Sequence, residues 1–312
     1  MSPITPRKKP YAALTQHKPV LLKETLDLLA LQPDDIVLDG TFGGGGHAME
    51  ILKRIGPDGK LIGLDQDASA LERFRLSHEM PPQLILRHAN FSQTDKVLKT
   101  LKISSLNAIL LDIGLSSDQL EEGERGFSFE RPGPLDMRMN QTETVTAADI
   151  LNGYSARDLE NLFREHGEMR FARRIAEEIV KVRPLSTTSE LVKAVERGIP
   201  EAMSRERGKR PAWARRHPAT KIFQAIRVTV NQELEILKKS LPILFKRLKS
   251  RGKMAIISFH SSEDRIVKRT FLEWTQSEQA LRITRKPVIA QREESLSNPR
   301  ARSAKLRVVE KR

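Results

Sequence analysis

The segment VLDGTFGGGGHA, residues 37–48, carries the residue types that most plainly point to a ligand site in this chain. Gly43, Gly45 and Ala48 satisfy the relaxed G-x-G-x-x-A fingerprint of turns that bind dinucleotides. Asp65 lies twenty positions beyond Gly45, where an acid would accept hydrogen bonds from a ribose. Taken alone, these residues predict an adenosine-containing ligand.

Asp39 stands ahead of the glycines, at the expected end of a strand, and it narrows the choice of ligand. A carboxylate at this point would repel a pyrophosphate, but it suits a sulfonium or ammonium centre. S-adenosylmethionine carries both of these cationic groups and no phosphate, so it fits better than a dinucleotide. The alternative is a turn that only packs a helix on a strand, which the backbone entropy of four glycines disfavours.

Acidic and aromatic residues also follow the other expected strands. Asp65 is either a ribose acceptor or the cap of the next helix, and we favour the ribose because Asp67 is better placed to cap. Phe91 would stack on an adenine or fill the core. Asp112 interrupts the apolar run ILLDIG, and a carboxylate at that depth requires a partner, either the cofactor or a nearby arginine.

The chain contains no cysteine, which limits the chemistry it can perform. Thiolate zinc sites, iron–sulfur clusters and a cysteine nucleophile are all excluded. Methylation of carbon-5 of a pyrimidine normally requires a thiolate adduct, and radical methylation requires an iron–sulfur cluster. Direct displacement at nitrogen or oxygen remains, and an exocyclic base amine held about 3 to 3.5 Å from the methyl group suits it.

Short apolar runs alternate with helical segments from Ile36 onwards, a pattern typical of βαβ units around a mostly parallel sheet. The expected strands cover residues 36–38, 61–64, 84–86, 108–113 and 254–259, with helices over 47–54 and 68–78. Ligands bind beyond the carboxyl ends of strands in such sheets, so the glycines and the acids above should meet there. Residues 288–290 and 306–309 are expected to form a closing antiparallel pair.

A helical insertion is expected between residues 119 and 217, where no buried-strand pattern occurs. Ser155 and Thr188 are expected to cap two of its helices, and Pro184 to end another. One long amphipathic helix, residues 219–239, should return the chain to the sheet. Pro242 should lie in the first turn of the next helix, which should end at residues 251–252.

These elements predict an α/β fold whose domains follow the chain in four parts. Residues 1–16 are a disordered basic tail, 17–118 the first part of the core, 119–217 the helical insertion for substrate recognition, and 218–312 the second part of the core. The N-terminal residues lack the apolar stretch of a secretory signal, and no apolar run approaches the roughly 20 residues that span a bilayer. We therefore expect a cytoplasmic protein without a membrane segment.

A net charge of +14 favours a polyanionic partner, and its distribution matters more than its total. The segment RERGKRPAWARRHPATK places cationic side chains around Trp213, which together would supply phosphate contacts and a stacking face. A solvated basic loop is the alternative. The C-terminal residues 285–312 are basic too, so the sequence favours a large RNA or ribonucleoprotein partner.

Several long blocks resemble one family. DGTFGGGGH, LLDIGLSS, ERGFSFERPGPLDMRM, HPATKIFQAIRVTVNQEL, ISFHSSEDRIVK and NPRARSAKLRV look like the bacterial ribosomal small-subunit RNA cytosine-N4 methyltransferase family, known as RsmH or MraW. The match runs from His17 to the C-terminal residues. The extended N-terminal tail and the RERGKRPAWARR stretch look less typical of the family.

The resemblance implies a Rossmann-like class I methyltransferase sheet with an inserted helical domain. It implies S-adenosylmethionine as the cofactor, 16S ribosomal RNA of the small ribosomal subunit as the substrate, and the exocyclic N4 of a cytidine in the decoding region as the methyl acceptor. It implies no metal and leaves the oligomeric state open, with a homodimer as one alternative. The family's cofactor contacts carry over onto Gly45, Gly46, His47, Asp65, Phe91, Asp112 and Gln119.

Catalytic residues do not transfer in the same way. The candidates for orienting the amine, all expected at strand ends, are Asp112, Ser116, Ser117, His260 and Asp264. Two other functions remain open from the sequence. One is a nicotinamide-dependent dehydrogenase, which the relaxed fingerprint allows, and the other is a ribosome assembly factor that makes little use of the cofactor pocket.

Overall fold

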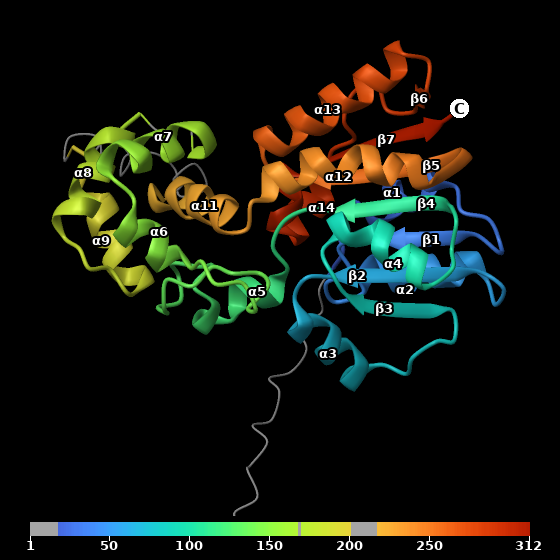
Figure 1. The fold of residues 1–312 in the computed structure, drawn as a ribbon, viewed down its shortest axis with the longest axis horizontal. Coiled ribbons are helices and arrows are strands. Elements are labelled where there is room, and N and C mark those ends of the chain that lie inside the picture. Colours follow the sequence, from blue (N-terminus) through green and yellow to red (C-terminus); the bar gives the residue numbers. More distant parts are fainter. Residues whose placement is uncertain (1–17, 168–169, 201–216) are drawn as a thin grey trace, which may run out of the picture.

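A seven-stranded sheet forms the centre of the computed structural model, which describes residues 18–167, 170–200 and 217–312 (Figure 1). Its strand order is β3-β2-β1-β4-β5-β7-β6. The strands are β1 (Ile36–Asp39), β2 (Lys60–Asp65), β3 (Leu84–His88), β4 (Leu106–Asp112), β5 (Leu248–Ser258), β6 (Ala280–Arg282) and β7 (Lys305–Lys311). β1 to β5 run parallel, and β7 runs antiparallel to both of its neighbours. The expected class I methyltransferase sheet is thereby confirmed.

Helices cover both faces of the sheet because its central strands are apolar on both sides. Along β4, Ala108 and Leu110 pack on one face, and Ile109 and Leu111 pack on the other. The first face is covered by α1 (Leu22–Leu29), α2 (Gly46–Ile55) and α3 (Ala68–Ser77). The second is covered by α4 (Thr94–Thr100), α12 (Glu233–Arg247) and α13 (Ser261–Gln276). The carboxyl ends of the parallel strands are thus left for a ligand.

A second hydrophobic core lies beside the sheet and is formed mainly by helices (Figure 1). It is built from α6 (Ala147–Gly153), α7 (Ala156–Gly167), α8 (Ala172–Lys181), α9 (Thr188–Arg197) and α11 (Ala219–Val230). Buried residues of α11, among them Ile222 and Ile226, belong to this core. The helical unit therefore extends through Val230, beyond the end expected at residue 217. Shorter helices, α5 (Ser117–Glu121) and α14 (Arg292–Ser297), flank the sheet's ligand-binding end.

The long helix expected over residues 219–239 is wrong, because the chain breaks into α11 and α12. Gln232 has a left-handed backbone, with φ 49°. Asn231 fixes the break, since its side chain accepts a hydrogen bond from the Met139 amide at 2.7 Å and donates one to the Met137 carbonyl at 2.8 Å. Apolar residues recur at helical spacing on both sides of the break. The sequence pattern therefore does not predict the break, which depends on contacts with Met137 and Met139.

Other element boundaries also differ from expectation. Pro242 lies inside α12 rather than in its first turn, and Arg251, with φ 62°, lies within β5 rather than at a helix end. Val288 makes only a single bridge to Leu306, while β7 pairs with β5 and β6. Thr187, not Thr188, caps α9.

Two sequence-based expectations fall outside the described residues. They are the disordered tail over 1–16 and the basic stretch around Trp213. Among the helices that the structure describes, none is both long and apolar enough to span a membrane.

Candidate active site

A pocket opens at the carboxyl ends of β1, β2, β3 and β4, and we call it the cofactor pocket. Six of the seven predicted cofactor residues line it: Gly46, His47, Asp65, Phe91, Asp112 and Gln119. Residues from four strand ends and from two helix starts thus converge, as the topology of an open α/β sheet requires. Lining residues that were not assigned from the sequence include Gln66, Asn90, Asn231, Glu233, Phe259 and Arg300.

Gly45, the seventh predicted residue, does not line this pocket. Its backbone is left-handed, with φ 77°, and a Cβ added there would lie 2.4 Å from Cε2 of Phe74 in α3. The glycine is therefore required by the start of α2 and by the close approach of Phe74. Its neighbour Gly46 lies on the pocket side.

Asp65 links the end of β2 to the glycine loop. One carboxylate oxygen accepts a hydrogen bond from the Gly43 amide at 2.7 Å, and the other accepts one from the Asp67 amide at 2.8 Å. Burial raises the pKa of Asp65 to about 6, so the carboxylate is ionised above neutral pH. Each oxygen keeps a second lone pair, which is available to a ribose hydroxyl.

Asp39 lies beneath the loop rather than on the pocket wall. Its side chain is buried, and one oxygen accepts a hydrogen bond from the Thr41 amide at 3.1 Å. Burial, with smaller contributions from the charges of Asp112 and Asp65, raises the pKa of Asp39 to about 7. Its effect on a cationic ligand therefore acts through space rather than by contact.

Asn in place of Asp39 is expected to flatten the dependence of stability on pH. Between the ordinary pKa of 3.8 and about 7, the unfolded chain releases this proton while the folded chain keeps it. Stability therefore falls as pH rises through this window, by up to about 4 kcal/mol. Urea unfolding of the ligand-free protein measures the free energy of unfolding at pH 5 and at pH 8. The change in this free energy between the two pH values should be smaller for Asp39→Asn than for the wild type. Equal differences would contradict the assignment.

His47 and Asp112 face each other across the pocket. Nε2 of His47 lies 3.1 Å from the Val20 carbonyl, and Nδ1 lies 3.7 Å from a carboxylate oxygen of Asp112. Burial lowers the pKa of His47 to about 4, so the ring is neutral and Nε2 donates its proton to the carbonyl. Nδ1 is then a lone-pair acceptor beside a carboxylate, and this pair suits an ammonium group.

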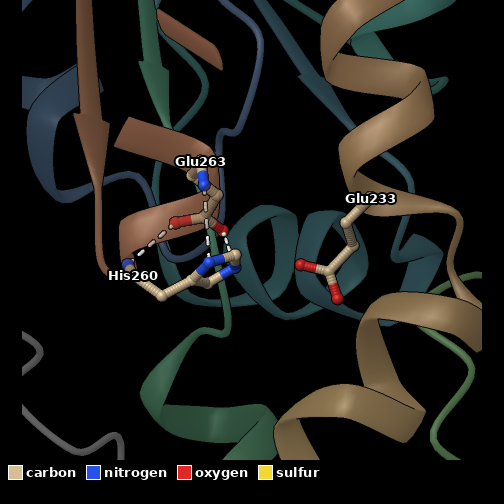
Figure 2. A group of neighbouring side chains, drawn as sticks. All are labelled: Glu233, His260 and Glu263. Atoms are coloured by element: carbon tan, nitrogen blue, oxygen red, sulfur yellow. Dashed lines mark hydrogen bonds and ion pairs between the residues drawn. The ribbon is translucent and has the colours of Figure 1, made fainter. Parts of the chain in front are cut away.

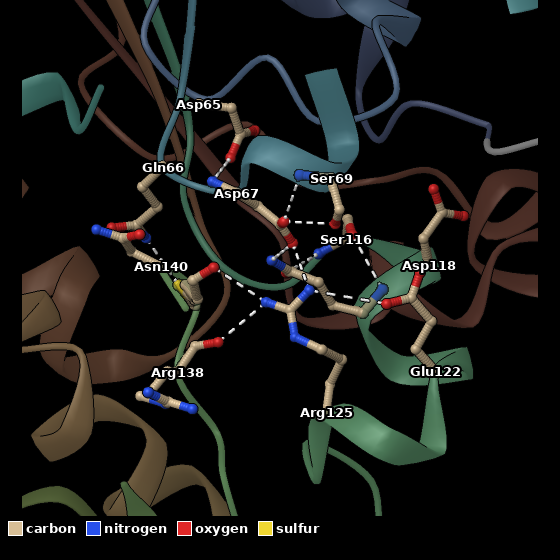
Figure 3. Close-up of polar contacts among 12 residues, drawn as sticks. Asp65, Gln66, Asp67, Ser69, Ser116, Asp118, Glu122, Arg125, Arg138 and Asn140 are labelled. Carbon is tan, nitrogen blue, oxygen red and sulfur yellow. Dashed lines mark hydrogen bonds and ion pairs between the residues drawn. The ribbon is translucent and has the colours of Figure 1, made fainter. Parts of the chain in front are cut away.

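A buried ion pair connects the β2–α3 loop to the start of the insertion (Figure 3). Arg125 donates to Asp67 at 2.8 Å and to the carbonyls of Arg138 and Met139 at 2.9 and 3.0 Å. Gln119 donates to the same Asp67 oxygen at 3.0 Å and accepts from the Ser116 amide. Asp67 also caps α3, as expected. Its bonds to Gln119 and Arg125 could not be predicted from the sequence, because these residues lie 52 and 58 positions away.

Arg300 is the most informative pocket residue that sequence reasoning missed. Its guanidinium lies over the Phe259 ring at 5.9 Å and donates to the Ser117 hydroxyl at 2.9 Å. Burial lowers its pKa, and the negative charge of Asp112 acts in the opposite direction. Arg300 belongs to the block NPRARSAKLRV, which resembles the family, but the spacing of residues in the sequence does not show that this arginine reaches the pocket.

A second cavity adjoins the cofactor pocket and shares part of its lining. Gly114, Leu115, Phe259 and Arg300 line both. The rest of the second cavity includes Phe127, Phe129, Arg131, Phe223, Arg227 and His260. Two spaces meeting at a common wall suit a transfer between two bound molecules, one in each.

The five catalytic candidates divide by their contacts. Asp112 lines the cofactor pocket and His260 the second cavity. Ser116 caps α5 while lining the cofactor pocket, and Ser117 accepts from Arg300. Asp264 is engaged in a buried ion pair with Arg307 at 2.6 Å.

Comparisons with known proteins agree on one family. The model of the MraW methylase family matches residues 14–312. A ribosomal RNA small subunit methyltransferase H from Symbiobacterium thermophilum is 43% identical, over 95% of this chain and 96% of that protein. The protein of the same name from Syntrophotalea carbinolica is 44% identical, over 94% of this chain and 97% of its own length. With a family model spanning nearly the whole sequence and relatives this similar along their full length, the chain belongs to the MraW methylase family.

Proposed function

We propose that this protein transfers a methyl group from S-adenosylmethionine to the exocyclic N4 amine of a cytidine in the decoding region of 16S ribosomal RNA. The observation that carries the proposal is the common wall of the cofactor pocket and the second cavity. Membership of a methylase family favours this reaction over the hydride transfer that the glycine fingerprint also allowed. The names of the relatives support the small ribosomal subunit as the partner.

The cofactor pocket fits S-adenosylmethionine by the chemistry of its donors and acceptors. Asp65 offers acceptor lone pairs for the ribose, while neutral His47 and Asp112 offer acceptors for the ammonium group. Gly46 and Pro19 both line the pocket, and a Cβ added at Gly46 would lie 3.0 Å from Pro19, so a larger residue there would disturb the pocket wall. When bound, the cofactor supplies an electrophilic methyl group.

The second cavity suits a planar base. Phe129 lies on its wall. The centroid of its ring is 5.4 Å from that of Phe223 and 4.9 Å from that of His217. Arg227 and Arg131 add positive charge to the lining for a nucleotide. A base held there would have its exocyclic amine near the wall that the two cavities share, which Gly114 and Leu115 help to form, and proximity to the bound cofactor would supply much of the rate.

The helical unit and the basic segments would hold the RNA around this cavity. A base in folded RNA is reached in a loop or turned out of its stack, which costs a few kcal/mol. Contacts of the insertion with the surrounding RNA would offset that cost. In this proposal the insertion recognises the substrate and the sheet domain carries out methyl transfer.

The reaction is tested by incubating the protein with labelled S-adenosylmethionine and small ribosomal subunits from cells that lack it. Digestion to nucleosides and mass spectrometry should show the label in N4-methylated cytidine. Label in another nucleoside would overturn the N4 assignment. Cofactor binding without any label in RNA would favour the alternative of an assembly factor.

Truncation of Phe129 to alanine should weaken use of the RNA substrate without affecting the cofactor. Loss of a stacking face costs about 1 to 3 kcal/mol, so kcat/KM for the subunit should fall by about 5- to 150-fold. Affinity for S-adenosylmethionine, measured by calorimetry, should not change. Leu76→Ala, at an exposed residue of α3 outside both cavity linings and outside the basic segments, is the control and should retain full activity. Equal kinetics for the two variants would exclude Phe129 from the base site.

A further inference from the structure

Three ionisable side chains meet between the two cavities, and we call Glu233, His260 and Glu263 the acid–imidazole cluster (Figure 2). Each offers one ligand atom, and these atoms lie within 4.8 Å of one another. Glu233 begins α12 and lines the cofactor pocket, whereas His260 precedes α13 and lines the second cavity. The cluster therefore joins two helices that the sequence separates.

Surrounding contacts hold both carboxylates in place. Arg227 donates to the two oxygens of Glu233 at 2.7 and 2.9 Å. Oε2 of Glu263 accepts hydrogen bonds from the amides of Phe259 and His260 at 2.8 and 3.2 Å. Carboxylates that ligate metals are characteristically hydrogen-bonded in this way, and their oxygens retain lone pairs for a cation.

Among the described residues, two atoms that face the centre of the cluster contact each other but form no hydrogen bond. The Glu263 side chain is 1% exposed, and its Oε1 forms no hydrogen bond of good geometry. The His260 side chain is 10% exposed, and its Nε2 likewise forms no hydrogen bond of good geometry, although it lies 2.8 Å from Oε1 of Glu263. Buried polar atoms normally have a partner, and Figure 2 shows both atoms on the side that faces Glu233.

The charges of the cluster also favour a bound cation. Glu233 and Glu263 are both buried, and both carboxylates lie beside the His260 ring. Two buried carboxylates beside one imidazole thus favour an additional positive charge between them.

We propose that the acid–imidazole cluster binds one divalent transition-metal ion, of the Zn²⁺ or Mn²⁺ type, through one oxygen of each glutamate and Nε2 of His260. Carboxylates suit Mn²⁺ and imidazole suits Zn²⁺, while Mg²⁺ prefers an all-oxygen set with several waters. Binding moves the ring proton to Nδ1, so the long 3.4 Å contact of Nδ1 with the Glu263 amide is lost. The ion would fix Glu233 and, through it, Arg227 on the wall of the second cavity.

No metal was expected from the sequence, and the reason for the difference is spacing. Glu233 lies 27 residues before His260, in another helix, so no short motif joins them. The competing arrangement is the direct contact of His260 Nε2 with Oε1 of Glu263 at 2.8 Å, with no metal bound.

Metal binding is tested on the full-length, tag-free protein after treatment with a chelator. Titration with ZnCl₂ or MnCl₂ in a calorimeter should show saturable binding of about one ion per chain, and MgCl₂ should bind far more weakly. Glu263→Gln keeps the capping contacts of α13, and His260→Asn keeps a side chain that caps helices well. Each should lower the affinity at least tenfold.

The matched control is Glu273→Gln, which removes one carboxylate from the exposed side of the same helix. It should bind the ion as the wild type does. Absence of saturable binding, or equal affinity in the wild type and both cluster variants, would overturn the proposal in favour of the direct contact between His260 and Glu263. Because the readout is binding of the metal itself, the result is independent of whether the methylated atom is N4.

Discussion

Alanine in place of Asp65 is expected to lower the affinity for S-adenosylmethionine by about 100-fold or more. A hydrogen bond to a charged group contributes about 1.5 to 3 kcal/mol, and the carboxylate can accept one from each of two ribose hydroxyls. The loss of about 3 kcal/mol corresponds to about a 100-fold change in dissociation constant. Isothermal titration at pH 8, where Asp65 is ionised, measures it directly.

The same assignment predicts how cofactor affinity depends on pH. Protonation of Asp65 converts an acceptor into a donor, so affinity should fall as pH drops through about 6 in the wild type. This inflection should be absent from Asp65→Ala. Asp58→Ala, at an exposed residue in the turn before β2, is the matched control and should bind like the wild type. Unchanged affinity in Asp65→Ala would remove the ribose assignment.

Methionine in place of Arg125 is expected to lower the free energy of unfolding by about 3 to 5 kcal/mol. The Arg125 and Asp67 side chains are 4% and 3% exposed, and removing the cation leaves a buried carboxylate without its charged partner. Two backbone carbonyls lose their donor as well. Chemical denaturation followed by circular dichroism measures the change.

A double variant separates the effect of losing the ion pair from the cost of leaving one buried charge without its partner. Asp67→Asn combined with Arg125→Met removes both charges, so it should be more stable than Arg125→Met alone. Arg173→Met, which breaks an exposed pair with Glu177, is the control and should change stability by less than about 1 kcal/mol. A similar small change in Arg125→Met would mean that the buried pair contributes little.

The sequence was sufficient to predict the sheet and the edge at which the ligand binds. Apolar runs bounded by turns determine where strands form, and parallel connection brings their carboxyl ends together. For this reason the sequence alone predicts that Asp65, Phe91 and Asp112 lie near one another, and all three line the cofactor pocket. The family assignment followed from long contiguous blocks, which are also local information.

Only the tertiary structure decided the features that depend on contacts between distant residues. Gly45 packs against Phe74 rather than on the cofactor pocket, and Asn231 breaks an apparently continuous helix by pairing with the 137–139 segment. Arg300 reaches the pocket from near the C-terminus. Periodicity reports which face of an element is buried, but not which partner buries it or which polar group meets it there. The glycine loop was therefore determined by sequence, whereas the buried Asp39 beneath it and the acid–imidazole cluster beside it exist only because the fold brings their members together.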